Sequence, residues 1–150
     1  MPEARSNWHL VSKNFEVPVY YEDTDFSGYV FHPNYLKYFD RAREELIGRD
    51  LLKRLWLDGR HFVVKSAAQE FMAPARHGDT LLVQTWIEFS QSPLVRFRHE
   101  VRIKGDDPSK KPVASAVIEL VSVSEKGFPV RLPSVLQDLF QSKISVITPK

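Results

Sequence analysis

The order of the hydrophobic patterns constrains the fold of this chain more than any other feature. Apolar residues alternate with polar ones from Phe15, a helical pattern follows from His32, and the rest of the chain is mostly strand-like. The strand-like runs are rich in Val, Ile, Phe and Thr and are separated by turn formers; they cover residues 61–73, 80–90, 94–104 and 113–124. One strand, one long helix and about four consecutive strands predict an α+β domain, with the helix lying on an antiparallel sheet.

Length and composition place this domain in a soluble class. The chain has 150 residues, which suits one domain but not two separate cores. We expect residues 1–12 to form a flexible N-terminal arm and residues 13–150 to form a single domain. The sequence contains neither a secretory signal pattern nor an apolar stretch of about 20 residues, so we expect no transmembrane segment and a cytoplasmic location. The absence of Cys excludes disulfides and a Cys nucleophile, and the His spacing indicates no metal site.

The start of the helix is the best-determined local feature. Pro33 suits the first helical position, because its missing N–H would be unpaired there in any case. A residue before Pro is pushed towards extended dihedrals, which makes His32 the expected N-cap. The apolar face and the end of the helix follow from Tyr35, Phe39, Ala42, Leu46 and Gly48.

Asp25 lies in the turn-rich segment EDTDFSG, shortly before this helix. A helix N-terminus presents unpaired N–H groups and a partial positive charge, which together would stabilise a developing oxyanion. If the loop folds back, an amide at position 32, 34 or 35 could polarise a carbonyl facing the Asp25 carboxylate, which would act as general base or nucleophile. Gly28 would permit the close turn. The residues alone leave open a simpler alternative, in which Asp23 and Asp25 only stabilise the turn and His32 is only a cap.

A second charged feature is the basic set Arg96, Arg98, Arg102 and Lys104, which alternates with apolar residues along one predicted strand. Such a stripe can face water, meet the phosphates of a nucleotide-bearing cofactor, or bind RNA. The aromatic residues of this strand point to the opposite face, which is wrong for a base-stacking platform. We therefore rank solvent first, phosphate contact second and nucleic acid third, and the net charge of +2 adds no argument for nucleic acid.

The segment YYEDTDFSGYVFHPNYLKYFDRAR resembles the signature of the hotdog-fold 4-hydroxybenzoyl-CoA thioesterase family. Within that family it is most similar to the broad acyl-CoA thioesterases associated with the Tol–Pal system. The matching residues are Tyr21, Asp23, Thr24, Asp25, Gly28, Val30, His32, Tyr35, Phe39, Ala42 and Arg43. The later segment GFPVRLP resembles the closing segment of the family, so that the likeness spans residues 15–135.

The resemblance implies a hotdog fold, an antiparallel sheet wrapped around a long central helix. It also implies homodimers with active sites at the interface, which commonly associate into homotetramers. The catalytic carboxylate of the family falls on Asp25, and its carbonyl-polarising backbone amide falls on His32. The benzoyl-specific branch carries Tyr at the latter position, which argues against a hydroxybenzoyl substrate.

These features together predict an acyl-CoA thioesterase, which releases a carboxylic acid and free CoA without a metal or redox cofactor. Gly28 would shape the loop, Tyr35 and Phe39 would line or support the acyl pocket, and Arg131 is the candidate for the CoA phosphates. One alternative is an enoyl-thioester hydratase or dehydratase on the same fold, which would use an Asp–His or His–Glu pair. The other is a non-catalytic module that binds acyl carriers or RNA. The spacing of Asp25 and His32, with the helix cap at the second, favours the hydrolase.

Overall fold

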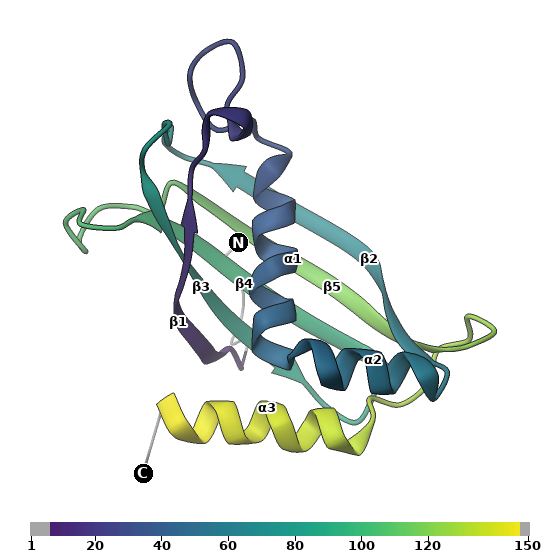
Figure 1. Cartoon of the computed structure of the whole chain (residues 1–150). Helices are drawn as coiled ribbons and strands as arrows, with labels where there is room; N and C mark the ends of the chain where they lie inside the picture. Colours follow the sequence, from purple (N-terminus) through teal and green to yellow (C-terminus); the bar gives the residue numbers. More distant parts are fainter. Residues whose placement is uncertain (1–6, 148–150) are drawn as a thin grey trace.

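The computed structural model describes residues 7–147 (Figure 1). Its strands and helices follow the chain in this order: β1 His9–Pro18, a 3₁₀ helix Tyr21–Asp23, α1 Asn34–Ile47, α2 Arg49–Leu57, β2 Arg60–Phe71, β3 Thr80–Phe89, β4 Leu94–Ile103, β5 Ala114–Ser124 and α3 Ser134–Ile147. Among these residues, none of the helices has the length and apolar character needed to cross a membrane.

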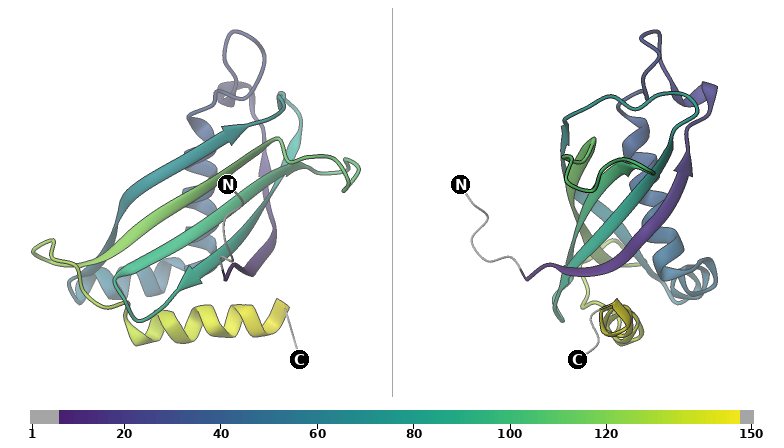
Figure 2. Two further views of the ribbon diagram at one scale, coloured as in Figure 1. Left: turned by 180° about the vertical axis from the view of Figure 1, so that it is seen from behind. Right: turned by 90° about the vertical axis from the view of Figure 1, so that its left-hand side faces the viewer.

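The five strands form one antiparallel sheet in the order β1-β3-β4-β5-β2. The sheet curves around α1, which crosses one of its faces, while α3 lies beyond one end of the sheet (Figure 2). This is the α+β hotdog architecture that the sequence predicts. The sheet buries its inner face against α1, so the core lies between the two.

Pro33 and Gly48 flank α1, but the start of the helix lies one residue later than predicted. The first residue of α1 is Asn34, so Pro33 and not His32 is the N-cap. Pro33 has helical dihedrals, φ −63° and ψ −19°, immediately before the first residue of α1. Gly48 ends the helix with φ 94°, a conformation that glycine adopts without a steric cost, and its N–H donates to the carbonyl of Glu44 at 2.7 Å. Between these ends, α1 buries Tyr35, Tyr38, Phe39, Ala42, Arg43 and Leu46.

The N-terminal region differs from the prediction. β1 begins at His9, so residues 9–12 belong to the sheet and not to an arm, while residues 1–6 lie outside the described residues. Two register shifts against β3, between Leu10 and Phe15, interrupt the alternation of apolar and polar residues. The hydrophobic pattern therefore does not indicate this part of the strand. Tyr21 lies beyond this strand, in the 3₁₀ helix, and is 81% exposed.

The basic stripe on β4 lies on the outer face of the sheet, among carboxylates from neighbouring positions. Arg96 pairs with Glu88 at 2.8 Å, and Arg98 and Arg102 each pair with Glu100 at 3.1 Å. The alternate residues of β4 are buried on the helix side. The stripe is therefore balanced by acidic partners, as a solvent-facing sheet surface often is.

The inner face of β4 contains one buried polar group, His99, which bonds to α1 and β3. Its ring stacks on Phe39 with 4.7 Å between centroids. Arg43 Nη1 lies 2.9 Å from His99 Nε2, and Thr85 Oγ1 lies 3.0 Å from His99 Nδ1. Because a guanidinium can only donate, Nε2 accepts from Arg43 and the protonated Nδ1 donates to Thr85. Burial, followed by the charge of Arg43, holds the pKa of His99 well below its usual value.

Candidate active site

Asp25 lies at the start of a tight loop between the 3₁₀ helix and α1. The loop is closed by a bridge between Thr24 and Val30, and the N–H of Asp25 donates to the carbonyl of Tyr29 at 3.0 Å. The N–H of Gly28 donates back to the carbonyl of Asp25 at 3.0 Å, with φ 83° at Gly28. This positive φ is the reason that the turn requires glycine.

The Asp25 carboxylate is exposed and is held by Ser27. Its Oδ1 accepts a hydrogen bond from the Ser27 N–H at 2.9 Å and another from the Ser27 hydroxyl. These bonds lower the pKa of Asp25, the hydroxyl being the larger cause and the N–H the second. Asp25 is therefore ionised near neutral pH, the form that can accept a proton from water or attack a carbonyl. Sequence reasoning missed Ser27, although an Asp followed two residues later by Ser is a common turn pattern.

The start of α1 supplies one unused amide. The N–H of Asn34 donates to the carbonyl of Phe31 at 2.8 Å, the N–H of Tyr35 donates to that of His32 at 3.2 Å, and Pro33 has no N–H. Within residues 7–147, the backbone N–H of His32 has no hydrogen-bond partner. The structure thus reduces the candidate amide donors from three to one.

Asp23 supports the loop instead of facing the pocket. Its Oδ2 accepts from the N–H of Tyr20 at 2.8 Å, and its carbonyl accepts from the N–H of Phe31 at 2.9 Å and from the side chain of Asn34 at 2.9 Å. The alternative in which the carboxylate only stabilises the turn therefore fits Asp23. Asp25 also accepts local hydrogen bonds, from Ser27, but its carboxylate remains exposed at the pocket.

Asp25 and His32 border one open pocket of about 520 Å³. The loop, the first turn of α1, the end of β2 and the segment after β2 form its wall, through Asp25, Ser27, Tyr29, Val30, His32, Tyr35, Phe71, Met72, Ala73, Pro74 and Ala75. The rings of His32 and Tyr35 each lie 5.7 Å from that of Phe71, centroid to centroid. Phe71 and Met72 could not be found from local sequence, because sheet pairing brings them to the site.

Phe39 and Arg131, two of the predicted substrate residues, lie away from this pocket. Phe39 is fully buried, one helical turn further along α1 than Tyr35, and stacks on His99 in the core. Arg131 is exposed in the segment between β5 and α3 and is not part of the pocket wall. Of the predicted substrate residues, the structure therefore brings Gly28 into the Asp25 loop and Tyr35 into the pocket wall of the same chain.

Comparison with known proteins identifies the family of this chain. Residues 27–109, more than half of the chain, match the family described as the Thioesterase superfamily. The chain therefore belongs to the Thioesterase superfamily and is a thioester hydrolase.

Two relatives align with this chain over nearly their whole length. The chain is 30% identical over 129 residues to the acyl-CoA thioesterase YbgC of Haemophilus influenzae, a match that covers 84% of this chain and 95% of the relative. It is 33% identical over 129 residues to the acyl-CoA thioesterase YbgC of Helicobacter pylori, covering 83% and 96%. The solved structure of Slr0204, a 1,4-dihydroxy-2-naphthoyl-CoA thioesterase from Synechocystis, shares the fold with a TM-score of 0.76 at 24% identity, covering 86% of this chain and 95% of that chain.

Proposed function

We propose that the chain hydrolyses acyl-CoA thioesters at the pocket bordered by Asp25 and His32. The observation that carries this proposal is the pairing of an ionised carboxylate with the one helix-start amide that lacks a partner in the described chain, both on one pocket. The names of the two YbgC relatives support acyl-CoA as the substrate class. We propose further that the enzyme acts in the cytoplasm.

In the proposed reaction, the carbonyl oxygen of the thioester accepts a hydrogen bond from the His32 N–H. Asp25 takes a proton from water, the water oxygen attacks the carbonyl carbon, and the C–S bond then breaks as the CoA sulfur receives the proton. In the other route, Asp25 attacks the carbon itself and the C–S bond breaks, so that CoA leaves as a thiolate and a mixed anhydride forms. Water then hydrolyses the anhydride, which restores the Asp25 carboxylate and supplies the proton that the thiolate takes up. Both routes give one carboxylic acid and one CoA from one thioester and one water, without a metal or redox cofactor.

A thiol-release assay tests this function directly. Purified protein is mixed with a panel of acyl-CoAs from acetyl to dodecanoyl, and the free thiol is measured against an Asp25→Asn control. We expect release with at least one member of the panel and nearly none in the variant. Hydration of but-2-enoyl-CoA without thiol release would instead support the hydratase alternative, in which Asp25 and His32 act as a side-chain pair.

The pH dependence of the reaction follows from Ser27. Because the reaction needs the Asp25 carboxylate, kcat/KM falls as the pH drops through the pKa of Asp25. Ser27→Ala removes the larger cause of the lowered pKa, so we expect the acid limb of the profile to move to higher pH. Ser109→Ala is the matched control, because the Ser109 N–H makes the same 2.9 Å turn bond to Asp107 in a distant loop. An acid limb that is the same in Ser27→Ala and wild type would contradict this role of Ser27.

The exposed edge of the sheet supports a homodimer. β2 has 12 residues and pairs on one side only, with β5, in the described chain. It leaves Val63 46% exposed, Val64 56% and Phe71 47%. A long apolar edge strand of this kind has unpaired backbone N–H and C=O groups that can pair with a strand of another chain. Proteins usually cover or block such an edge. We propose that two β2 strands pair antiparallel across a twofold axis, which would also cover the open Asp25 pocket beside Phe71.

We expect light scattering to give a mass at least twice that of one chain, in a homodimer or a homotetramer. The expectation holds at micromolar concentration, because the apolar edge and the open pocket both need a partner surface. A fully active monomer at that concentration would show that neither the edge nor the site requires a second copy.

A further inference from the structure

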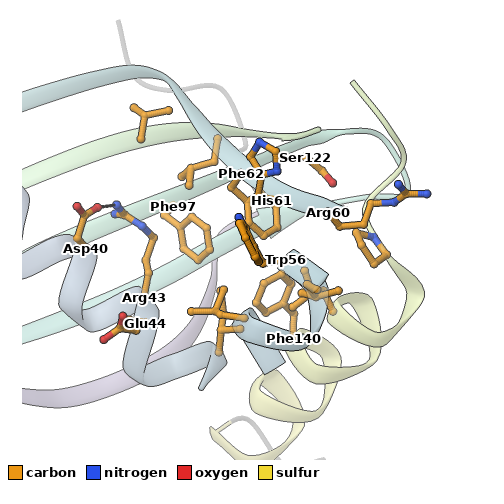
Figure 3. A pocket seen from close by; sticks show the side chains of 17 residues that line it. Asp40, Arg43, Glu44, Trp56, Arg60, His61, Phe62, Phe97, Ser122 and Phe140 are labelled. Atoms are coloured by element: carbon orange, nitrogen blue, oxygen red, sulfur yellow. Dashed lines mark hydrogen bonds and ion pairs between the residues drawn. The ribbon is translucent and has the colours of Figure 1, made fainter. Parts of the chain in front are cut away.

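A second cavity lies at the opposite end of α1 from Asp25. It has a volume of about 430 Å³ and lies between α1, α2, α3 and the inner face of the sheet (Figure 3). Aromatic side chains from four elements surround it, namely Trp56 of α2, Phe62 of β2, Phe97 of β4 and Phe140 of α3. Its size falls within the range of small-molecule sites.

The interior of this cavity is suited to an aliphatic chain. Leu52, Leu55, Leu120 and Leu136 complete much of the wall between the aromatic rings. The buried guanidinium of Arg43 is already bonded to Asp40 and to His99. The carboxylates of Asp40 and Glu44 are 71% and 45% exposed. Arg60, the fourth charged residue of the wall, is also exposed. The charged groups of the wall are thus paired or exposed to solvent, which favours a hydrocarbon ligand inside.

The cavity and the Asp25 pocket share no lining residue, yet both border β2. The cavity uses Arg60, His61, Phe62 and Val64 at the first half of β2, whereas the Asp25 pocket uses Phe71 at its end. In an antiparallel pair related by a twofold axis, the start of each strand lies opposite the end of its partner. A twofold axis perpendicular to the sheet keeps the helices on one face, so each cavity would face the Asp25 pocket of the other subunit.

We propose that this cavity binds the aliphatic acyl chain of the substrate whose carbonyl lies at the partner subunit's Asp25. This inference rests on the proposed function and on the proposed β2 pairing. It specifies the substrate class as CoA thioesters with unbranched chains long enough to cross the interface, and it assigns Trp56, Phe62, Phe97 and Phe140 to the recognition of the chain.

Chain-length dependence gives the first test. Each methylene buried in the cavity can raise kcat/KM by up to about fourfold. We therefore expect kcat/KM for dodecanoyl-CoA to exceed that for butanoyl-CoA by at least about tenfold in the wild type. Leu52→Trp fills the cavity from α2 and should remove most of this ratio. Leu57→Trp is the matched control, because Leu57 lies on the same helix, is 77% exposed and does not line the cavity.

Mixed dimers test whether the chain crosses between subunits. One subunit carries Asp25→Asn, the other carries Leu52→Trp, and the pair is purified through two different affinity tags. The remaining carboxylate then belongs to the Leu52→Trp subunit and faces the open cavity of its partner. We expect this dimer to keep the wild-type ratio of dodecanoyl to butanoyl activity. A ratio as low as that of Leu52→Trp homodimers would show that each cavity serves its own Asp25, and would overturn the proposal.

Further outcomes separate this inference from the proposed function. Hydrolysis of the whole acyl-CoA panel without dependence on chain length, or with the same dependence in Leu52→Trp, would overturn the inference and leave the thioesterase function intact. An active monomer would also overturn the inference alone. Absence of thiol release with every acyl-CoA would instead remove the proposed function. Circular dichroism and light scattering on each variant must show a folded protein of unchanged mass before rates are compared.

Discussion

Asp25→Asn is expected to lower kcat by about a thousandfold while leaving the fold unchanged. An amide cannot take a proton from water or attack a carbonyl, and a positioned acid–base group typically contributes about 10²–10⁴-fold. The side-chain oxygen of Asn can still accept the hydrogen bonds that Ser27 donates to Asp25, so the loop keeps its closure. Thiol release under saturating acyl-CoA, together with a thermal melt, measures both parts of the expectation.

Asp23→Asn is the control for this experiment. Asn at this position can still accept the bond from the N–H of Tyr20, and the bonds that the carbonyl of Asp23 accepts from Phe31 and Asn34 are unaffected. We expect a loss of less than about tenfold, because the change touches loop support and not a reacting group. An Asp25→Asn enzyme within a few-fold of wild type would remove Asp25 from catalysis.

The second large effect concerns the backbone at position 32. If the His32 N–H polarises the carbonyl, His32→Pro deletes the donor, and loss of one oxyanion donor costs about 10²–10³-fold in kcat. This N–H has no partner in residues 7–147, so its removal breaks no internal hydrogen bond there. His32→Ala keeps the amide and should lose only about one to two powers of ten through the altered pocket and helix start.

The pair of variants distinguishes the amide from the imidazole. If folded His32→Ala is as inactive as Asp25→Asn, the ring of His32 is essential. That result would favour a mechanism in which Asp25 and His32 act as a side-chain pair. If both variants retain near-wild-type rates, the start of α1 is not the oxyanion site. His32→Pro also restricts Phe31 before it, so circular dichroism and the oligomeric mass must match those of the wild type.

Local signals predicted the elements whose boundaries depend on a few neighbouring residues. Pro33 and Gly48 mark the two ends of α1 because each restricts or permits particular dihedrals there. The four later strands begin and end within two residues of their predicted bounds, since turn clusters interrupt them. The turn-forming residues around Asp25 likewise predicted a tight loop, in which Gly28 permits the close turn.

Features that depend on distant pairing could not be predicted in this way. Nothing local indicates that β2 pairs with β5 and remains an edge, although this pairing brings Phe71 to the site. The helical pattern places Tyr35 and Phe39 on one face, but only the packing of β4 decides that Phe39 stacks on His99 while Tyr35 reaches the pocket. The cavity beside α2 is formed by three helices and the sheet together, so no local segment of the sequence indicates it.

The neutral imidazole of His99 links the stability of the enzyme to protons. Its pKa is depressed in the folded protein, whereas in the unfolded chain it returns to about 6.5. Below that pH the imidazole of His99 is protonated in the unfolded chain but stays neutral in the folded protein. The free energy of unfolding therefore falls by about 1.4 kcal/mol per pH unit until the pH reaches the pKa of His99 in the folded protein. The stabilising contribution is complete above pH 6.5 and is lost on acidification. Acid therefore destabilises the core around His99, because the bonds of His99 to Arg43 and Thr85 leave no place for a second ring proton.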